Sequence, residues 1–588
     1  MNGEIDNGKR LISITGGNLR NHHLYISGYH DFFPAECYGQ SSARKGTGHK
    51  LTLLVDGLTR PVETDIATSK NNGRPRSFFR KRAWVARFFA RHNLREGDAV
   101  AIERLDRFTY RIYPEGGRSI GHRKAKHCAS KAPGAPNQAM LFPDVHDEKR
   151  PSRGKAGFGD TAFTKNRNEP LHRWVPWIAG FSGAFVQEVF ESASPADPSA
   201  VTVLDPFAGV GTTLVEGLMR GYNVVGFEIN PYAALASDLK VSCVRHRPKP
   251  LSEVVSQLEH LASQNSRERG EPKSKAPPGF RSRTAFFSPS VERDVLLLQD
   301  FIAEQRNPLV GKVLRVALGA VMVGFSNYSY EPSLSTRAAA GKPPVEHADV
   351  FGIFRDKVRE IEADIRFLQR HMKSFKHRPE ATVYERSYLR GADALPRASV
   401  DILITSPPYL NNYHYVRNTR PQLYWLGLTQ GNGKLKQLEE DNFGRFWQTV
   451  RNGPPIELHF DLPELQEVLD TVRKRNSERG VYGGAGWANY AAAYFNDCHT
   501  FFEVTKRVMK PNGLAVVVIG NNIVQGVHIE TDRFLAEIAR LHGFRLETMH
   551  LVRKKRTGSS IVNSSVRAGM MKQRVELHET AVELRAPV

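Results

Sequence analysis

Two patterns of apolar and polar positions divide the chain. Short apolar runs separated by turn residues occupy the first hundred residues, and one segment there has apolar residues at helical spacing. A Gly-, Pro-, Lys- and Ser-rich stretch with few large apolar residues follows, a composition typical of a linker. The pattern predicts strands at 51–55, 99–103 and 110–113, a helix at 81–91, a β-rich domain at 15–114 and a linker at 115–165.

From residue 166 to 588, buried-strand runs alternate with helical segments, which is typical of an α/β fold with a parallel sheet. A mostly helical stretch at about 240–380 interrupts this alternation and contains a basic Pro/Gly loop at 271–284. We therefore expect an α/β domain with a helical insertion. Its predicted elements are strands at 201–204, 224–228, 400–405 and 514–519, with a helix at 214–220.

Composition narrows the class of protein. The chain has 588 residues, of which 40% are hydrophobic, so a wholly disordered chain is excluded. No apolar run reaches the ~18 residues that a membrane span needs, and the first residues lack the apolar core of a secretion signal. The four cysteines lie far apart, so neither a CxxC metal pair nor a disulfide framework is indicated. We expect a cytoplasmic protein with no membrane and no metal.

The charge changes the picture more. There are 83 Lys and Arg against 61 Asp and Glu, a net charge of +22, which favours a polyanionic partner. Between Ile66 and Arg95 there are nine basic residues and no acidic residue. This stretch is either a solvated surface or a nucleic-acid contact, and charge alone does not separate DNA from RNA. The residues that we expect to contact DNA are Arg74, Arg76, Arg80, Lys81, Arg82 and Arg87.

The loop DPFAGVGTT (205–213) follows a predicted strand and precedes a predicted helix. Its glycines allow a ligand to approach the backbone, and a side chain at Gly211 is expected to occupy the ligand's space. Glu228 ends the next strand, where a carboxylate can accept hydrogen bonds from a ribose diol. A tight strand–helix turn is the simpler interpretation of a lone GxG. Because the Walker lysine and the third glycine of the dinucleotide fingerprint are missing, a nucleoside ligand without pyrophosphate fits better.

Five segments together resemble S-adenosylmethionine-dependent amino-methyltransferases of DNA. They are the loop at 205–213, VVGFEINPYA (224–233), GADA (391–394), the aromatic segment 172–185 and, above all, SPPY (406–409), which is similar to the catalytic motif of the cytosine-N4 enzymes. The resemblance implies a Rossmann-like fold and S-adenosylmethionine as cofactor. The cofactor-binding residues that it implies are Phe181, Asp205, Phe207, Ala208, Gly209, Gly211, Thr212, Glu228, Asn230 and Asp393, and the catalytic residues are Ser406, Pro407, Pro408 and Tyr409.

The chemistry explains why SPPY suits methylation of an exocyclic amine. The lone pair of such an amine is delocalised into the base, so the nitrogen must be polarised before it attacks a methyl group. The Ser406 hydroxyl and the Pro407 carbonyl can accept its two N–H bonds, and Tyr409 offers a face for a base flipped out of the duplex. Taken alone, SPPY could be a Pro-rich turn. Cytosine-C5 chemistry needs a nucleophilic Cys beside Pro, and no cysteine here follows a proline.

The N-terminal region resembles B3-type DNA-binding pseudobarrels, which also occur in restriction endonucleases. The residues that carry this resemblance are Trp84, Phe88, Asn93, Leu94, Gly97 and Asp98, with GYHDFFP at 28–34. A helix that packs aromatic residues on a barrel is the competing interpretation. Recognition of a target sequence is expected from this region, from the insertion or from the segment 427–480.

The function expected from the sequence is a site-specific DNA cytosine-N4 methyltransferase that acts on double-stranded DNA. Such a protein would be bacterial or archaeal and would work in restriction-modification, with a cognate endonuclease as a further candidate partner. Adenine-N6 methylation of DNA, an RNA amino-methyltransferase and a non-enzymatic DNA-binding protein remain as alternatives, in that order.

Overall fold

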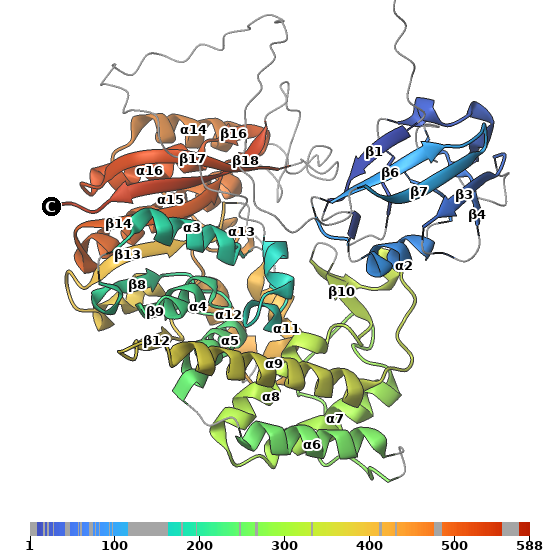
Figure 1. Ribbon diagram of the computed structural model, residues 1–588. Coiled ribbons are helices and arrows are strands. Elements are labelled where there is room, and N and C mark those ends of the chain that lie inside the picture. The colour runs from blue at the N-terminus through green and yellow to red at the C-terminus, as the bar shows by residue number, and fades with distance from the viewer. Residues whose placement is uncertain are drawn as a thin grey trace, which may run out of the picture. The chain divides into compact units, whose positions relative to one another are not determined.

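A computed structural model describes most of the chain, and the described residues form two compact units, Met1–Glu148 and Lys149–Val588 (Figure 1). Each unit is described by itself. The expected linker lies outside the described residues except at Glu115 and 163–165. The described residues are 9–115 without 16–17, 20–22, 27–28, 41–47, 57, 59–60, 70–74, 77, 82, 93 and 97, and 163–555 and 576–588 without 178–179, 196, 246–248, 265–267, 331–332, 411–413, 430–431 and 476–484.

The first unit is built on a five-stranded sheet in the order β1-β6-β7-β3-β4. Its neighbouring strands are antiparallel, except that β3 and β7 are parallel. Helix α2 (Ala83–Arg91) buries Trp84 and Phe88 in the core of this unit. The strands are β1 (Lys9–Ser13), β3 (Leu51–Val55), β4 (Val62–Thr64), β6 (Ala99–Arg104) and β7 (Thr109–Glu115), and β2 (Tyr38–Gly39) and β5 (Ile66–Ala67) form a separate parallel pair.

The second unit contains a seven-stranded sheet in the order β12-β9-β8-β13-β14-β18-β17. The strands from β12 to β14 are parallel, and β18 runs antiparallel to both of its neighbours. These strands are β8 (Thr202–Asp205), β9 (Asn223–Phe227), β12 (Ala381–Tyr384), β13 (Val400–Thr405), β14 (Met509–Gly520), β17 (Arg545–Lys555) and β18 (Leu577–Arg585). The expected mixed α/β fold is confirmed for this unit.

The strand order changes direction between β8 and β13. From β8 the chain adds β9 and β12 on one side, and it then returns to place β13 and β14 on the other side. Ligands of open α/β sheets bind outside the carboxyl ends of the strands at such a switch point. The loops after β8 and β13, which begin at Pro206 and Ser406, both lie at this point.

Alternate residues of the sheet belong to two different cores. On β8 and β13, Val203 and Ile404 pack in one cluster, whereas Leu204 and Leu403 pack in the other. Because side chains along a strand point alternately to its two faces, these clusters lie on opposite faces of the sheet. The helical insertion contributes to the first cluster through residues such as Phe351, so it extends the layer that covers that face.

The insertion contributes α6 (Lys249–Ser263), α7 (Pro289–Ala303), α8 (Pro308–Val321) and α9 (Val350–Met372), which lie together below the sheet in the view of Figure 1. In the chain, a two-stranded hairpin follows α8 and precedes α9. It consists of β10 (Tyr328–Tyr330) and β11 (Leu334–Thr336), which the apolar pattern did not predict. The longer helices of this unit also include α3 (Gly183–Ala193), α4 (Thr212–Met219), α5 (Pro231–Ser242), α11 (Tyr415–Trp425), α12 (Asn432–Glu440), α14 (Pro463–Lys474), α15 (Ala485–Val508) and α16 (Thr531–Leu541).

Candidate functional site

The loop after β8 is held by its own backbone and by the acid that precedes it. The Phe207 amide donates to Asp205 Oδ1 at 3.1 Å, and the Gly211 amide donates to the Ala208 carbonyl at 2.7 Å. Asp205 is fully buried, and burial raises its pKa to about 6. Its Oδ1 also accepts from the Thr405 hydroxyl at 2.6 Å, at the end of β13. Asp205 therefore joins the two strands of the switch point and does not line the pocket itself.

Glu228 follows β9 and closes the same loop from the other side. Its Oε2 accepts from the Gly209 amide at 2.9 Å, and its Oε1 accepts from the Asn230 amide at 2.7 Å. Burial raises its pKa to about 7, while these two amides act in the opposite direction. Each carboxylate oxygen retains a second lone pair, so Glu228 can still accept from a ligand. Asn230 caps α5, and its Nδ2 donates to the Thr419 hydroxyl at 2.7 Å.

A buried lysine supports the loop from behind. Lys240 on α5 is fully buried, and its Nζ donates to the Val210 carbonyl at 2.7 Å. Burial lowers its pKa to about 7, and the distant carboxylate of Asp364 acts against this shift. The conformation of the glycine loop therefore depends on a polar contact made inside the protein.

The SPPY loop follows β13. Ser406 is half-buried, and its hydroxyl donates a weak hydrogen bond to Tyr409 Oη at 3.4 Å. Burial raises the pKa of Tyr409 well above its ordinary value, so its phenol is neutral. Since the hydroxyl proton of Ser406 points to Tyr409, the lone pairs of its oxygen remain available as acceptors. Tyr409 packs against the second core cluster and does not line the pocket.

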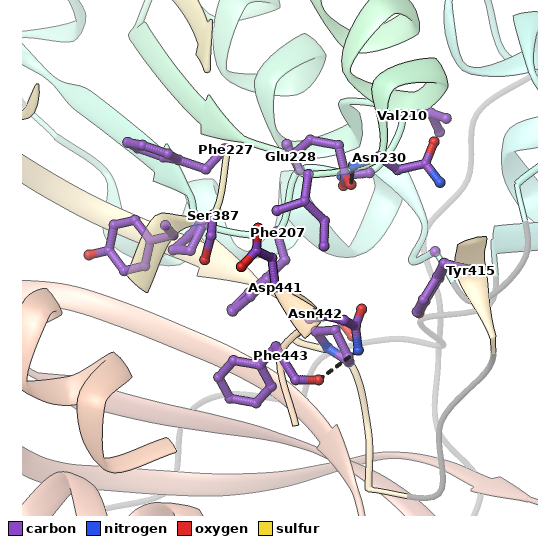
Figure 2. A pocket seen from close by; sticks show the side chains of 18 of the residues that line it. Phe207, Val210, Phe227, Glu228, Asn230, Ser387, Tyr415, Asp441, Asn442 and Phe443 are labelled. Carbon is purple, nitrogen blue, oxygen red and sulfur yellow. Dashed lines mark hydrogen bonds between the residues drawn. The ribbon is translucent and has the colours of Figure 1, made fainter. Parts of the chain in front are cut away.

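Residues of both loops line one pocket (Figure 2). In this view Phe227, Glu228 and Asn230 lie on one side, Asn442 and Phe443 lie on the other, and Tyr415 lies at one end. Of the residues expected from the sequence, the pocket is lined by Phe181, Phe207, Ala208, Gly209, Thr212, Glu228, Asn230, Ser406 and Pro408. Asp205, Gly211, Pro407, Tyr409 and Asp393 are not among its lining residues.

Two of these residues behave differently from expectation. A Cβ at Gly211 would lie 3.0 Å from Ser237 Cβ on α5, so a side chain there meets this helix and not the ligand's space. Asp393 is exposed on a 3-10 turn and lies outside the pocket, where Ser387 stands instead. Ser387 lines the pocket and Asp393 does not because Ser387 is closer in the chain to the end of β12. Ser387 lies three residues after the end of β12, whereas Asp393 lies nine residues after it.

Several lining residues were not found from the sequence. Trp177 and Tyr415 stack with ring centroids 6.2 Å apart and an interplanar angle of 20°. Phe443 contacts Phe207 edge to face, with centroids 5.1 Å apart. Trp177 lies within the aromatic segment 172–185, and Tyr415 lies just after SPPY. Their position next to expected motifs could have identified both residues. The segment 441–443 had no such signal. Further residues that line the pocket include Trp177, Ser387, Tyr415, Asp441 and Phe443.

The aromatic segment 172–185 is fixed by buried polar contacts. His172 and Glu216 of α4 form a contact of 2.8 Å, and Asn166 donates to the Phe181 carbonyl at 3.1 Å. The Ser182 hydroxyl caps α3 by accepting from the Phe185 amide. These contacts hold the segment in which Phe181 lines the pocket.

In the first unit, one of the expected DNA-contacting residues that the structure describes, Arg80, is held by an internal ion pair. Arg80 Nε lies 2.7 Å from Asp65 Oδ1, and its NH2 donates to the Gln40 carbonyl. Burial acts to raise the pKa of Asp65, but the hydrogen bonds from Arg80 and from the Gly48 amide hold it below its ordinary value. Arg80 is therefore a structural cation. Lys81 is exposed and Arg76 is half-buried, Arg74 and Arg82 lie outside the described residues, and so does the side chain of Arg87.

The described residues contain neither a membrane-spanning helix nor a cluster of metal-binding side chains. No described helix is long and apolar enough to cross a membrane. Among the same residues, no group of three or more His, Cys, Asp or Glu side chains is placed to hold a metal ion.

Sequence comparison relates the chain to one class of protein. No family model matches it. The chain is 24% identical over 440 residues to Type II methyltransferase M.BsoBI of Geobacillus stearothermophilus, covering 68% of this chain and 83% of that protein. It is 24% identical over 383 residues to Type II methyltransferase M.MvaI of Kocuria varians, covering 63% and 82%. Type II methyltransferase M.AvaI of Nostoc sp. is also 24% identical, over 408 residues, covering 66% and 81%.

Structural comparison gives weaker likenesses. A geranyl diphosphate methyltransferase in complex with GPP and sinefungin has a TM-score of 0.26 and 8% identity, covering 74% of this chain and 90% of that one. The rRNA methyltransferase aviRa from Streptomyces viridochromogenes has a TM-score of 0.24 and 10% identity, covering 70% and 87%. The chain is thus similar in sequence to Type II methyltransferases over about two thirds of its length.

Proposed function

We propose that this protein is a site-specific DNA methyltransferase that transfers a methyl group from S-adenosylmethionine to the exocyclic N4 of cytosine in double-stranded DNA. One observation carries the proposal: Ser406 and Pro408 of SPPY line the same pocket as Gly209 and Glu228. A nucleoside-type loop and an amine-polarising loop therefore open into one space. The similarity to Type II methyltransferases over most of their length supports the same conclusion.

The residues of the pocket fit S-adenosylmethionine. Glu228 keeps acceptor positions for the ribose hydroxyls, and Phe227 and Tyr388 supply an apolar wall for the adenine. Aromatic faces attract a cation, so the Trp177–Tyr415 stack suits a sulfonium group, whereas the Asp441 carboxylate is already paired with Arg390. The cofactor, when bound, supplies an electrophilic methyl group. Ser387, which lines the pocket, replaces Asp393 as a cofactor-binding residue in this proposal.

The chain's own residues prepare the amine for attack. The Ser406 oxygen accepts one N–H of the cytosine amino group, and the Pro407 carbonyl accepts the other. Both contacts strengthen as the nitrogen becomes positive, so they act mainly in the transition state. Tyr409 holds the Ser406 hydroxyl in the accepting orientation through the bond between their oxygens. Tyr409 is then a positioning residue, and the face that stacks on the flipped base is left to other aromatic side chains.

The first unit is the proposed DNA reader, a B3-like domain whose basic residues contact phosphates. Lys81 and Arg76 remain candidates for this role, together with Arg74, Arg82 and Arg87. Arg80 is removed from the set, because its guanidinium is engaged by Asp65 and Gln40. In the cell the protein would act in the cytoplasm on chromosomal DNA, as the modification partner of a restriction endonuclease.

The proposal is tested by expressing the protein in cells without DNA methylation of their own, digesting their DNA and identifying the nucleosides by mass spectrometry. N4-methylcytosine in the cells that express the wild type, and much less with Ser406→Ala, is the expected result. N6-methyladenine would instead identify the adenine-N6 alternative. Unmodified DNA with methylated RNA nucleosides would contradict the DNA substrate.

A further inference from the structure

A second hollow lies in the insertion, outside the cofactor pocket, and its charge differs from that of the pocket. It measures about 720 Å³ and is lined by the loop 280–286, the hairpin β10–β11 and helix α11. We call it the insertion groove. Four arginines line it, Arg281, Arg283, Arg417 and Arg420.

No carboxylate lines the insertion groove, as far as the described residues extend. Arg281, Arg283 and Arg417 are exposed, and no ion pair of theirs is seen with any described residue. Glu439 interacts electrostatically with Arg420: burial raises the pKa of Glu439, and the positive charge of Arg420 acts against this shift. Glu331, at the turn of the hairpin, lies outside the described residues. The described part of the groove is therefore a site of concentrated positive charge.

Arg420 gives a second indication that the groove lacks its partner. Its Nε is buried, and no hydrogen-bond acceptor for it is found in the described part of the chain. A buried donor without a partner costs about 1–3 kcal/mol. An anionic ligand in the groove would provide the missing acceptor, and guanidinium groups match phosphate oxygens well.

The walls of the groove are joined to one another by hydrogen bonds. Tyr330 Oη donates to the Asn418 carbonyl at 2.9 Å, and the Leu334 amide donates to Asn418 Oδ1 at 2.7 Å, so the hairpin is fixed to α11. The Arg283 amide donates to Tyr328 Oη at 3.0 Å and fixes the loop to the hairpin. The arginines are therefore carried by a prebuilt surface, which lowers the entropy lost on binding.

Helix α11 connects this groove to the proposed reaction site. It begins at Tyr415, six residues after Tyr409, and Tyr415 lines the cofactor pocket. Arg417 and Arg420 follow within five residues on the same helix, about 3 and 7.5 Å further along its axis. One end of a single rigid helix therefore carries both a pocket residue and the groove cations.

We propose that the insertion groove binds backbone phosphates of the DNA strand that carries the target base. This interface rests on the proposed function, because a base held at the SPPY loop brings its own strand to the surface beside that loop. Phosphate contacts position a duplex without reading its sequence. The groove therefore supplies affinity and register, and base recognition lies elsewhere.

The test compares two variants of the full-length protein that each lose three exposed positive charges. The groove variant carries Arg281→Gln, Arg283→Gln and Arg417→Gln. The control variant carries Arg370→Gln, Lys373→Gln and Lys376→Gln, at the end of α9 in the same unit. Binding of a labelled 40-base-pair mixed-sequence DNA duplex is measured by fluorescence anisotropy across a range of salt concentrations. Calorimetric affinity for S-adenosylmethionine is measured in parallel.

Each lost phosphate contact lowers the slope of log affinity against log salt by about 0.9, so three lost contacts lower it by about 2.7. We expect this change in the groove variant and a change below about 1 in the control, with unaltered cofactor affinity in both. Equal changes in the two variants, or none in the groove variant, would overturn the proposal, as would a change seen with an RNA duplex alone. A wild type that binds DNA but fails to bind the cofactor would instead refute the proposed function, and the comparison of slopes would still decide the role of the groove.

Discussion

The two loops that meet at the switch point of the sheet are held in opposite ways. In the loop after β8, the amides of Phe207, Gly209 and Gly211 all have acceptors within the protein, and the Val210 carbonyl accepts from Lys240. In the loop after β13, Ser406 makes one weak hydrogen bond within the described part of the chain, to Tyr409. Most amides of the first loop are hydrogen-bonded, whereas among the described residues none donates a hydrogen bond to the Ser406 oxygen.

This difference separates binding from reaction. A loop that must present a fixed surface to a cofactor gains from rigid backbone bonds, because less order has to be imposed when the ligand binds. A loop that must accept new hydrogen bonds in the transition state needs lone pairs that nothing else occupies. Changes in the first loop should therefore alter cofactor affinity or stability, and changes in the second should alter the rate.

The largest expected effect is on the rate, in Ser406→Ala. Loss of this acceptor should slow single-turnover methyl transfer by ~10²–10³, equivalent to about 3–4 kcal/mol, because it acts on the amine as that group becomes positive. Cofactor affinity, measured by calorimetry, should stay unchanged.

Ser399→Ala is the matched control for this variant, since Ser399 immediately precedes β13, at the opposite end from Ser406. It should transfer at the wild-type rate. If Ser406→Ala also did so, SPPY would be a structural turn and the contrast between the two loops would be lost.

The second effect is on cofactor affinity, in Glu228→Gln. The variant replaces an ionised acceptor of two backbone amides with an amide group that can satisfy only one of them. Loss of one of these two charge-assisted bonds should weaken S-adenosylmethionine binding by about 2 kcal/mol, roughly thirtyfold. The rate at saturating cofactor should fall far less than in Ser406→Ala. A larger loss of rate than of affinity would show that the first loop also takes part in the reaction.

Glu228 should also make the stability of the cofactor-free protein depend on pH. Its pKa rises from 4.5 to about 7 on folding because of burial, so the folded protein binds this proton more tightly than the unfolded chain does. Stability should therefore fall as pH rises from 4.5 to about 7, by up to about 3 kcal/mol at ~1.4 kcal/mol per pH unit. In Glu228→Gln the calorimetric melting temperature should fall less over this range. Equal slopes in the two proteins would mean that Glu228 stays ionised.

Sequence patterns located those parts of the site that are formed by one continuous stretch of the chain. The glycine loop and SPPY each follow a buried strand, and strand ends can be located from apolar runs, so the position of each loop directly after a strand was predicted correctly. Asp393 was chosen by likeness to a motif, but the pocket is reached by residues just after the end of β12, and that strand was not predicted. Without its end point, Ser387 could not be preferred.

Long-range contacts account for the other omissions. Arg80 belongs to an acid-free stretch of sequence, yet its partner Asp65 lies fifteen residues away and is buried. The net charge of a segment does not show whether one of its cations forms an ion pair with a residue outside the segment. Phe443 reaches the pocket from a segment 34 residues after Tyr409 of SPPY, with no pattern of its own. These contacts depend on tertiary packing.

A smaller effect should come from the bond that joins the loops, between the Thr405 hydroxyl and Asp205 Oδ1. Thr405→Val keeps the shape and removes the donor, so the buried Asp205 loses a charge-assisted bond worth about 2 kcal/mol. The melting temperature should fall by a few degrees, and the pKa of Asp205 should rise further above 6. Nuclear magnetic resonance titration of the carboxyl carbon would follow this pKa. An unshifted pKa would show that the two loops are not coupled through this bond.

The smallest effect distinguishes the two glycines of the first loop. Gly209 has a φ of 51°, and a Cβ there would lie 3.2 Å from Trp177 Nε1, a lining residue of the pocket. Gly209→Ala should therefore weaken S-adenosylmethionine binding by about 1 kcal/mol. The causes are the strain of an alanine in the left-handed conformation and a small displacement of Trp177. Gly211 has a φ of 83°, and its Cβ would press on Ser237 of α5. Gly211→Ala should lower the melting temperature and leave cofactor affinity within about twofold, because its strain falls on helix packing. Calorimetric titration and melting of both variants measure the two effects side by side. The reverse pattern, with affinity lost at Gly211 and kept at Gly209, would place the ligand on the α5 side of the loop and would refute the pocket as the cofactor site.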